Sequence, residues 1–151
     1  MNKPEHKAEA RGLLSLQRGS LGTLAERDGR LYPFVSLVLP ARNGDGEIIL
    51  LLSDLSDHAR NLQRDPRASL LMDGTLALKE PLTGPRLTLL GEVQVSPDQA
   101  GDKALYLKAH PEAEMYAGFG DFRFYRFRCF EGLFVAGFGR IFRLKPEELK
   151  G

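Results

Sequence analysis

The sequence predicts a mainly β protein of the α+β class, with an antiparallel barrel at its centre and helices at its periphery. Most of the expected strands are joined by turns rather than by long crossovers, which is typical of antiparallel sheets. The strands are very apolar, and closing a sheet into a barrel hides their edges. No repeat, low-complexity tract or Ser/Gly linker divides the 151 residues, so we expect a single domain over residues 1–151.

A helix and a strong hairpin signal open the chain. Residues 6–18 have the apolar spacing of an amphipathic helix, which we expect to end at Gly19. The dipeptide Asp28-Gly29 favours a tight turn between strands at 20–26 and 30–40. By the same signals the remaining elements are strands at 47–52, 67–73, 86–95, 122–130 and 133–144, a loop at 74–85, and helices at 57–64, 97–109 and 112–117.

Two local patterns refine this assignment. Ser96 and Gln99, with a proline between them, have the order of a helix opening in which Ser96 is the N-cap. The strand at 122–130 places phenylalanines and arginines on one face. This face indicates either a subunit interface or pocket wall, or a β-bulge near Phe124-Tyr125 that changes which side chains point inward.

Charge and cysteine content exclude several classes of protein. There are 21 Lys and Arg residues against 20 Asp and Glu residues, so no global field attracts nucleic acid or an anionic membrane. No apolar run approaches the roughly 20 residues of a membrane span, and the first residues lack the apolar core of a signal peptide. With Cys129 as the only cysteine, the sequence indicates a reducing compartment, and we expect a cytoplasmic protein.

Residues 53–62 gather polar groups at the point where a buried strand gives way to a helix. A helix N-terminus has free backbone N–H groups and a partial positive charge, so the segment predicts a site for a phosphorylated small molecule. The alternative is a capped surface helix with solvated charges, which Asp54 and Asp57 favour because carboxylates repel phosphate. The candidate ligand-binding side chains of this segment are Ser53, Ser56, His58, Arg60 and Asn61.

The chain has no recognisable metal or nucleophile motif. The histidines lack metal-ligand spacing, and no zinc pattern, P-loop or GxSxG elbow is present. Gly137 and Gly139 lack the third glycine of a dinucleotide site, and Cys129 is interpreted as a packed small hydrophobe. His110, just before Pro111, is interpreted as a helix-end residue, with ligation of a haem iron as the alternative. An enzyme of this kind needs a cofactor to supply its chemistry.

Several segments resemble those of a known family in the same order. They are Ser-Leu-Val-Leu-Pro-Ala at 36–41, Leu-Leu-Ser-Asp-Leu-Ser-Asp-His-Ala-Arg-Asn-Leu at 51–62, Asp-Pro-Arg-Ala-Ser-Leu-Leu at 65–71 and Gly-Pro-Arg-Leu-Thr-Leu-Leu-Gly at 84–91. On these segments the chain resembles the pyridoxamine 5'-phosphate oxidase-like FMN-binding split-barrel family. The segments at 106–111, 116–122 and 136–140 resemble its haem-utilisation (HugZ-like) branch. The resemblance covers residues 9–144.

The resemblance implies a six- to seven-stranded antiparallel split β-barrel with peripheral helices, and a homodimer with two FMN sites between its protomers. It implies an FMN-dependent oxidoreductase that acts on a small redox substrate, with no catalytic side chain assigned. Arg86 is expected to reach the cofactor from its other face or from the partner chain. By position, the remaining cofactor contacts are the backbone of Ser36, Leu37 and Val38 at the isoalloxazine ring, and Ser53, Ser56, His58 and Arg60, with Asn61 nearby, at the ribityl phosphate.

Departures from the oxidase pattern favour other activities. The oxidase carries an arginine at the position of Ser36 and a lysine at that of Ala41, and its C-terminal segment for pyridoxal phosphate has no counterpart. True pyridoxamine phosphate oxidation is therefore not expected. The second hypothesis is a haem-binding or haem-degrading barrel with little or no flavin, in which His110 or His58 ligates iron and arginines pair with the propionates. A third is a barrel that binds neither ligand and serves as an interaction module.

Overall fold

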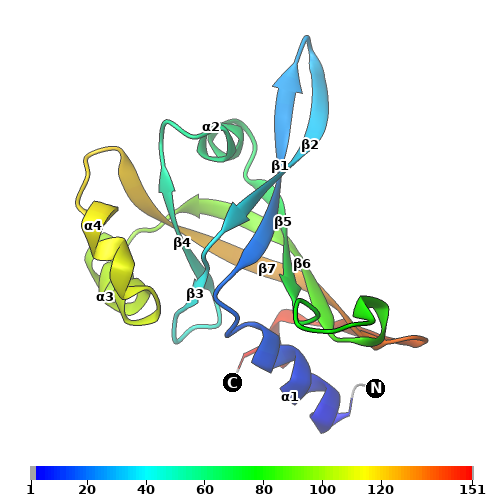
Figure 1. The fold of residues 1–151 in the computed structure, drawn as a ribbon. Helices are drawn as coiled ribbons and strands as arrows, with labels where there is room; N and C mark the ends of the chain where they lie inside the picture. Colours follow the sequence, from blue (N-terminus) through cyan, green and yellow to red (C-terminus); the bar gives the residue numbers. More distant parts are fainter. Residues whose placement is uncertain (1–2, 151) are drawn as a thin grey trace.

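The computed structural model describes residues 3–150 and confirms a mainly β, antiparallel fold with helices at its periphery (Figure 1). Within these residues the sheet has eight strands rather than six or seven. The strands are β1 (Gly19–Arg27), β2 (Arg30–Val38), β3 (Ala41–Arg42), β4 (Ile48–Ser53), β5 (Arg67–Asp73), β6 (Arg86–Val95), β7 (Phe122–Gly137) and β8 (Arg140–Leu144). The helices are α1 (Pro4–Leu13), α2 (Asp57–Arg64), α3 (Gln99–Ala109) and α4 (Glu114–Ala117), with 3-10 turns at Pro81–Thr83, Pro111–Ala113 and Pro146–Glu148.

The sheet is curled but not closed. Its strand order is β2-β1-β5-β6-β7-β4-β3, with β8 added to β7. The two end strands, β2 and β3, follow one another through Leu39 and Pro40 but are not neighbours in the described sheet, which makes the barrel a split one. Figure 1 shows the β1–β2 hairpin projecting beyond the other strands. Asp28 and Gly29 form its tip with φ of 52° and 77°, the left-handed geometry of a two-residue hairpin turn.

The turn between the two C-terminal strands lies between Gly137 and Arg140, and not at residues 131–132 as the sequence predicted. β7 runs without a break from Phe122 to Gly137, so the expected break at residues 131–132 is wrong. Gly132 makes room for packing instead of a turn, because a Cβ there would lie 3.1 Å from Leu149. The shift in register occurs between Leu90 and Gly91 of β6 and not at Phe124-Tyr125.

Two helices begin or end elsewhere than the sequence pattern suggests. α1 ends at Leu13 rather than at residue 18, and Gln17 beyond it donates to the Ala109 carbonyl at 3.0 Å. α3 is capped by Asp98, whose side chain accepts the Gly101 N–H at 2.9 Å. Ser96 is not the cap, because its hydroxyl oxygen accepts the Asp98 N–H at 3.0 Å in the preceding turn.

Two apolar clusters hold the fold together. The larger fills the barrel and includes Leu50 and Phe127, which have no exposed surface. The smaller lies between the sheet and α3, around Ile49 and Tyr106. Successive residues of β4 alternate between the two clusters, which is why the run at 48–52 is apolar without interruption.

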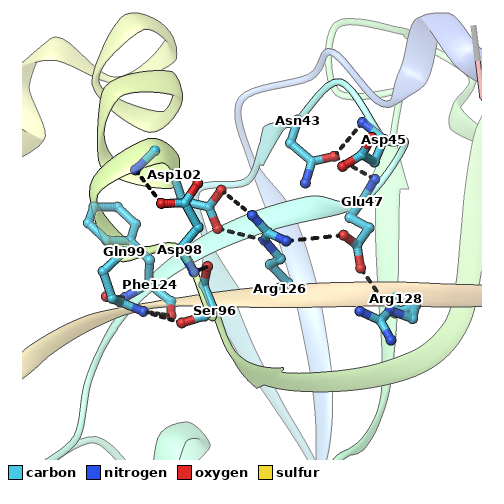
Figure 2. Close-up of polar contacts among 11 residues, drawn as sticks. Asn43, Asp45, Glu47, Ser96, Asp98, Gln99, Asp102, Phe124, Arg126 and Arg128 are labelled. Atoms are coloured by element: carbon cyan, nitrogen blue, oxygen red, sulfur yellow. Dashed lines mark hydrogen bonds and ion pairs between the residues drawn. The ribbon is translucent and has the colours of Figure 1, made fainter.

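A chain of charged groups anchors α3 to the sheet (Figure 2). Asp102 of α3 is 1 % exposed and accepts hydrogen bonds from Arg126 Nε and Nη2 at 2.8 and 2.9 Å. Arg126 also pairs with Glu47 at 3.5 Å, and Glu47 holds Arg128 at 2.8 Å. Burial pushes the pKa of Asp102 upward, but hydrogen bonds from Arg126 and Ser96 outweigh it and hold that pKa below its ordinary value.

Replacing Asp102 with Asn tests this anchor. We expect the free energy of unfolding at pH 7 to fall by roughly 2 kcal/mol, less than for a fully buried pair because Arg126 is partly exposed and keeps Glu47. Because the folded-state pKa is depressed, the wild-type advantage is present above about pH 4 and is lost as the pH falls through the folded pKa. Urea unfolding at pH 7 and pH 3 measures both effects.

The matched control is Glu9→Gln, which alters an exposed carboxylate of α1. It is expected to leave unfolding unchanged at both pH values. Equal stability of D102N and wild type at pH 7 would contradict the anchoring role of Asp102.

Candidate functional site

The β4–α2 turn, residues 53–56, is built from its own serine side chains. The Ser53 hydroxyl donates to Asp121 Oδ2 at 2.7 Å, and its oxygen accepts the Leu55 N–H at 3.2 Å. The Ser56 hydroxyl donates to the Ser53 carbonyl at 2.6 Å and caps α2 by accepting the Ala59 N–H at 3.3 Å. Both serine protons are thus engaged inside the protein, so neither serine donates to an outside ligand without losing one of these bonds.

Asp54 ties the same turn to β7. Its Oδ1 accepts hydrogen bonds from Arg123 Nε at 3.0 Å and from the Tyr125 hydroxyl at 2.8 Å, while its N–H donates to the Asp121 carbonyl at 2.7 Å. The bond to Asp54 raises the pKa of Arg123, and burial together with Asp54 raises the pKa of Tyr125. The carboxylate of Asp54 is therefore neutralised by β7 and fixes where α2 begins.

α2 brings His58 against β2. Its Nδ1 lies 3.0 Å from Ser36 Oγ, and no residue among 3–150 forms a hydrogen bond with its Nε2. Burial lowers the pKa of His58 below its usual 6.5, and Asp57 offsets only part of that effect. The ring is therefore neutral at pH 7. When Nδ1–H donates to Ser36, Nε2 carries a free lone pair, the arrangement found in metal-binding histidines.

Arg60 and Asn61 follow on the same helix but have different surroundings. The Arg60 side chain is exposed and makes no ion pair or hydrogen bond with any described residue. Asn61 is 2 % exposed, donates to Thr23 Oγ1 at 3.0 Å and accepts from Arg64 Nη2 at 2.8 Å. Asn61 therefore fastens α2 to β1, and Arg60 is the cation that a ligand can reach.

The three predicted backbone residues lie at the end of β2, beside α2. Ser36 is half-buried and contacts His58, whereas Val38 belongs to the main core. Leu37 points to the other face and is 62 % exposed. The structure thus brings Ser36, His58 and the β4–α2 turn together.

Arg86 is not part of this group within one chain. It begins β6, and its Nη1 donates to the carbonyls of Leu82 and Gly84 at 3.1 and 3.2 Å. Ser36 of β2 lies in register with Leu89 of β6 across β1 and β5, and Arg86 is three residues from Leu89. Arg86 is therefore separated from Ser36 by two intervening strands and does not adjoin His58 within one chain.

His110 and Cys129 occupy structural positions. His110 is 1 % exposed, and its Nε2 donates to the Pro40 carbonyl at 2.8 Å. Its ring also lies 4.8 Å from that of Tyr106 in the smaller core, so the hypothesis that His110 ligates a haem iron does not fit this geometry. Burial raises the pKa of Cys129 to about 11, which fits a packed, unreactive thiol.

The sequence reasoning missed an apolar groove of about 290 Å³ on the outer face of the sheet. Leu24, Pro33, Leu90 and Phe130 contribute to its walls. Thr23, which accepts the Asn61 amide, also lines the groove, so the groove adjoins α2. The signal in the sequence was a strand at 30–38 that is apolar on both faces although it lies at the edge of the sheet.

The sequence pattern of the family described as CREG, beta-barrel, matches residues 2–149. The chain belongs to the CREG β-barrel family. This CREG-type barrel is 38 % identical over 127 residues to the chloroplastic heme oxygenase HOZ of Arabidopsis thaliana, across 82 % of the chain but 38 % of that protein. It is 31 % identical over 138 residues to heme oxygenase HutZ of Vibrio cholerae, across 83 % of the chain and 74 % of HutZ. The chain thus spans less than two fifths of the plant relative's length.

Solved structures agree with this assignment of the CREG-type barrel. A heme binding protein from Mycobacterium smegmatis is 31 % identical with a TM-score of 0.86, covering 99 % of this chain and 62 % of that one. A pyridoxinephosphate oxidase family protein from Clostridium acetobutylicum is 16 % identical with a TM-score of 0.74, covering 98 % and 99 %, and shows the fold alone. The resemblance to this oxidase-like barrel family and its haem-utilisation branch is therefore confirmed.

Across residues 3–150, none of the helices combines the length and the apolar character that crossing a bilayer requires.

The depressed pKa of His58 is directly measurable. We expect its imidazole to titrate below pH 6.5 in ¹H–¹⁵N spectra of the histidine rings, because burial disfavours the charged form. The folded state binds the proton less well than the unfolded chain, so stability falls as the pH drops from the unfolded pKa toward the folded one. His58→Gln should remove this part of the decline. A His58 pKa at or above 6.5 would contradict the conclusion that burial disfavours the charged imidazole.

Proposed function

We propose that this CREG-type barrel binds haem beside α2 and the end of β2. Relatives at 31–38 % identity are called heme oxygenases or heme binding proteins, which supports this class of ligand. The observation behind the proposal is the geometry of His58, whose Nδ1 lies 3.0 Å from Ser36 Oγ and whose Nε2 has no hydrogen-bond partner among the described residues. A bound haem supplies an iron atom for a neutral imidazole and two propionates for cations.

His58 is the better of the two histidines named as iron ligands. His110 uses Nε2 to hold the Pro40 carbonyl and has almost no exposed surface. His58 is half-buried, and no described residue forms a hydrogen bond with its Nε2. Its partner Ser36 acts as the second residue that fixes ring orientation, as metal-bound histidines usually require. Arg60, exposed and unpaired among the described residues, is the cation placed to pair with a propionate.

FMN is the competing ligand, and the donor set favours haem over it. A ribityl phosphate needs several hydrogen-bond donors around its oxygens. The hydroxyl protons of Ser53 and Ser56 are engaged within the turn, and Asp57 places a carboxylate in the first turn of α2. Within residues 53–62, Arg60 is the one arginine or lysine, and it has no partner among the described residues; a single cation suits one carboxylate better than a phosphate dianion.

The proposal includes a homodimer that covers the outer face of β2. Leu31, Val35 and Leu37 are 55, 69 and 62 % exposed along this edge strand, and Phe130 beside the groove is 61 % exposed. An apolar surface of this extent is typical of an interaction site. A second protomer on this face would complete the groove, and the predicted contribution of Arg86 requires the partner's Arg86.

Haem titration of the full chain tests the ligand. We expect a Soret band with wild type, and no bound-flavin bands near about 370 and 450 nm when FMN is added instead. His58→Ala should weaken haem binding by at least about tenfold, and Arg60→Ala by roughly three- to tenfold because one charge-assisted contact is lost. Arg140→Ala, an exposed arginine at the β7–β8 turn, is the control and should bind as wild type.

Two results would overturn the proposal. Tight flavin binding without a Soret shift on haem addition would favour the hypothesis that the protein binds FMN. Unchanged haem affinity in both H58A and R60A would remove the site from α2.

The proposed dimer has its own test. Val35→Asp combined with Leu37→Asp places two charges on the apolar outer face of β2, and we expect a monomer by light scattering after size-exclusion chromatography. Leu76→Asp is the matched control, because Leu76 is 72 % exposed in the β5–β6 connection and should leave the dimer intact. A monomeric wild type, or a dimer that survives the double substitution, would contradict the interface.

A further inference from the structure

A second polar feature lies on a different part of the barrel, around Arg42 of β3. Arg42 is half-buried, and its side chain forms no hydrogen bond or ion pair with any residue among 3–150. The half-buried arginines of β6 and β7 differ from Arg42 because each has an acceptor, such as Asp54 for Arg123 and Asp102 for Arg126. A partly desolvated guanidinium without an anion is unfavourable, because burial costs it hydration and nothing in the described chain compensates.

The surroundings of Arg42 make this position still less favourable for a lone cation. Arg42 pairs with Ile48, which belongs to the main core, so its side chain lies on the barrel side of β3. Burial lowers the pKa of Arg42, and the positive charge of Arg11 on α1 lowers it further. Arg11 itself is half-buried and donates only to the Glu148 backbone carbonyl, at 3.1 Å. Arg11 therefore adds positive charge near Arg42 and does not compensate it.

A cavity of about 200 Å³ opens beside Arg42. Leu14, Leu16, Pro40 and Ala109 give it apolar walls, Ser15 and Gln17 also line it, and Arg42 is its one charged residue among those the structure describes. It shares no lining residue with the apolar groove next to α2. The cavity therefore combines a small apolar compartment with one uncompensated guanidinium, which is the chemistry of a site for a small organic anion.

We propose that Arg42 binds the oxyanion head of a small organic molecule whose apolar part occupies this cavity. The head is a carboxylate or a phosphate, since both match the fork of a guanidinium. The site is independent of haem and lies at the junction of α1, β3 and the end of α3. Binding would supply the negative charge that residues 3–150 do not place next to Arg42.

Thermal unfolding of the full chain at constant ionic strength tests the site with two probes, hexanoate and inorganic phosphate. Wild type should show an upward shift in Tm of roughly 3–6 °C at a probe concentration about ten times its Kd. Arg42→Met should show no specific shift, while Arg42→Lys should retain a smaller one because it keeps the charge without the fork. A larger effect of hexanoate identifies a carboxylate ligand, and a larger effect of phosphate identifies a phosphate ligand.

The substitution also has a signature in the absence of probe. Removing an uncompensated, half-buried cation should leave R42M at least as stable as wild type in buffer without either anion. Arg140→Met controls for loss of a surface charge and for general salt effects, and should respond as wild type. Equal Tm shifts in wild type and R42M, or an R42M variant clearly less stable than wild type without anion, would overturn the proposal.

Discussion

The attachment of the β4–α2 turn to the first residues of β7 is the constraint on which the candidate site depends. Asp54 accepts from Arg123 and Tyr125, and Ser53 donates to Asp121, so the turn is fixed from both sides of its backbone. This attachment sets where α2 begins and therefore where His58 meets β2. The same hydrogen bonds occupy the Ser53 hydroxyl, which the sequence pattern alone would assign to a ligand.

The structure thereby separates side chains that build the site from those that remain free to bind. Ser53 and Ser56 stabilise the turn and cap α2, and Asn61 holds α2 to β1. His58 and Arg60 keep a ring nitrogen and a guanidinium without partners among the described residues. A neutral imidazole next to one exposed cation suits a metalloporphyrin with propionates better than a phosphate dianion. The exposed apolar face of β2 adds a surface that a second protomer can cover.

Sequence reasoning reached the fold because its signals are local. The Asp28-Gly29 turn, the apolar run of β4 and the capped helix that follows it each depend on near neighbours, and the structure has all three, with Ser56 as the cap. It failed where distant contacts decide. The break expected at residues 131–132 is absent because β7 continues there, with Gly132 making room for Leu149. His110 was an alternative iron ligand, but the folded chain engages its Nε2 with the Pro40 carbonyl. The lack of an acceptor for Arg42 is likewise a property of the folded chain, invisible in a composition with balanced charge.

The most direct test of the account is where haem iron lies on the folded chain. Paramagnetic broadening of backbone amide signals in ¹H–¹⁵N spectra, recorded with ferric haem and with a diamagnetic zinc porphyrin as reference, reports that position. The account predicts selective loss of signals from the end of β2 and the first turn of α2, around Ser36 and His58. Broadening centred on α1 and β8, or none anywhere in the protein, would contradict it.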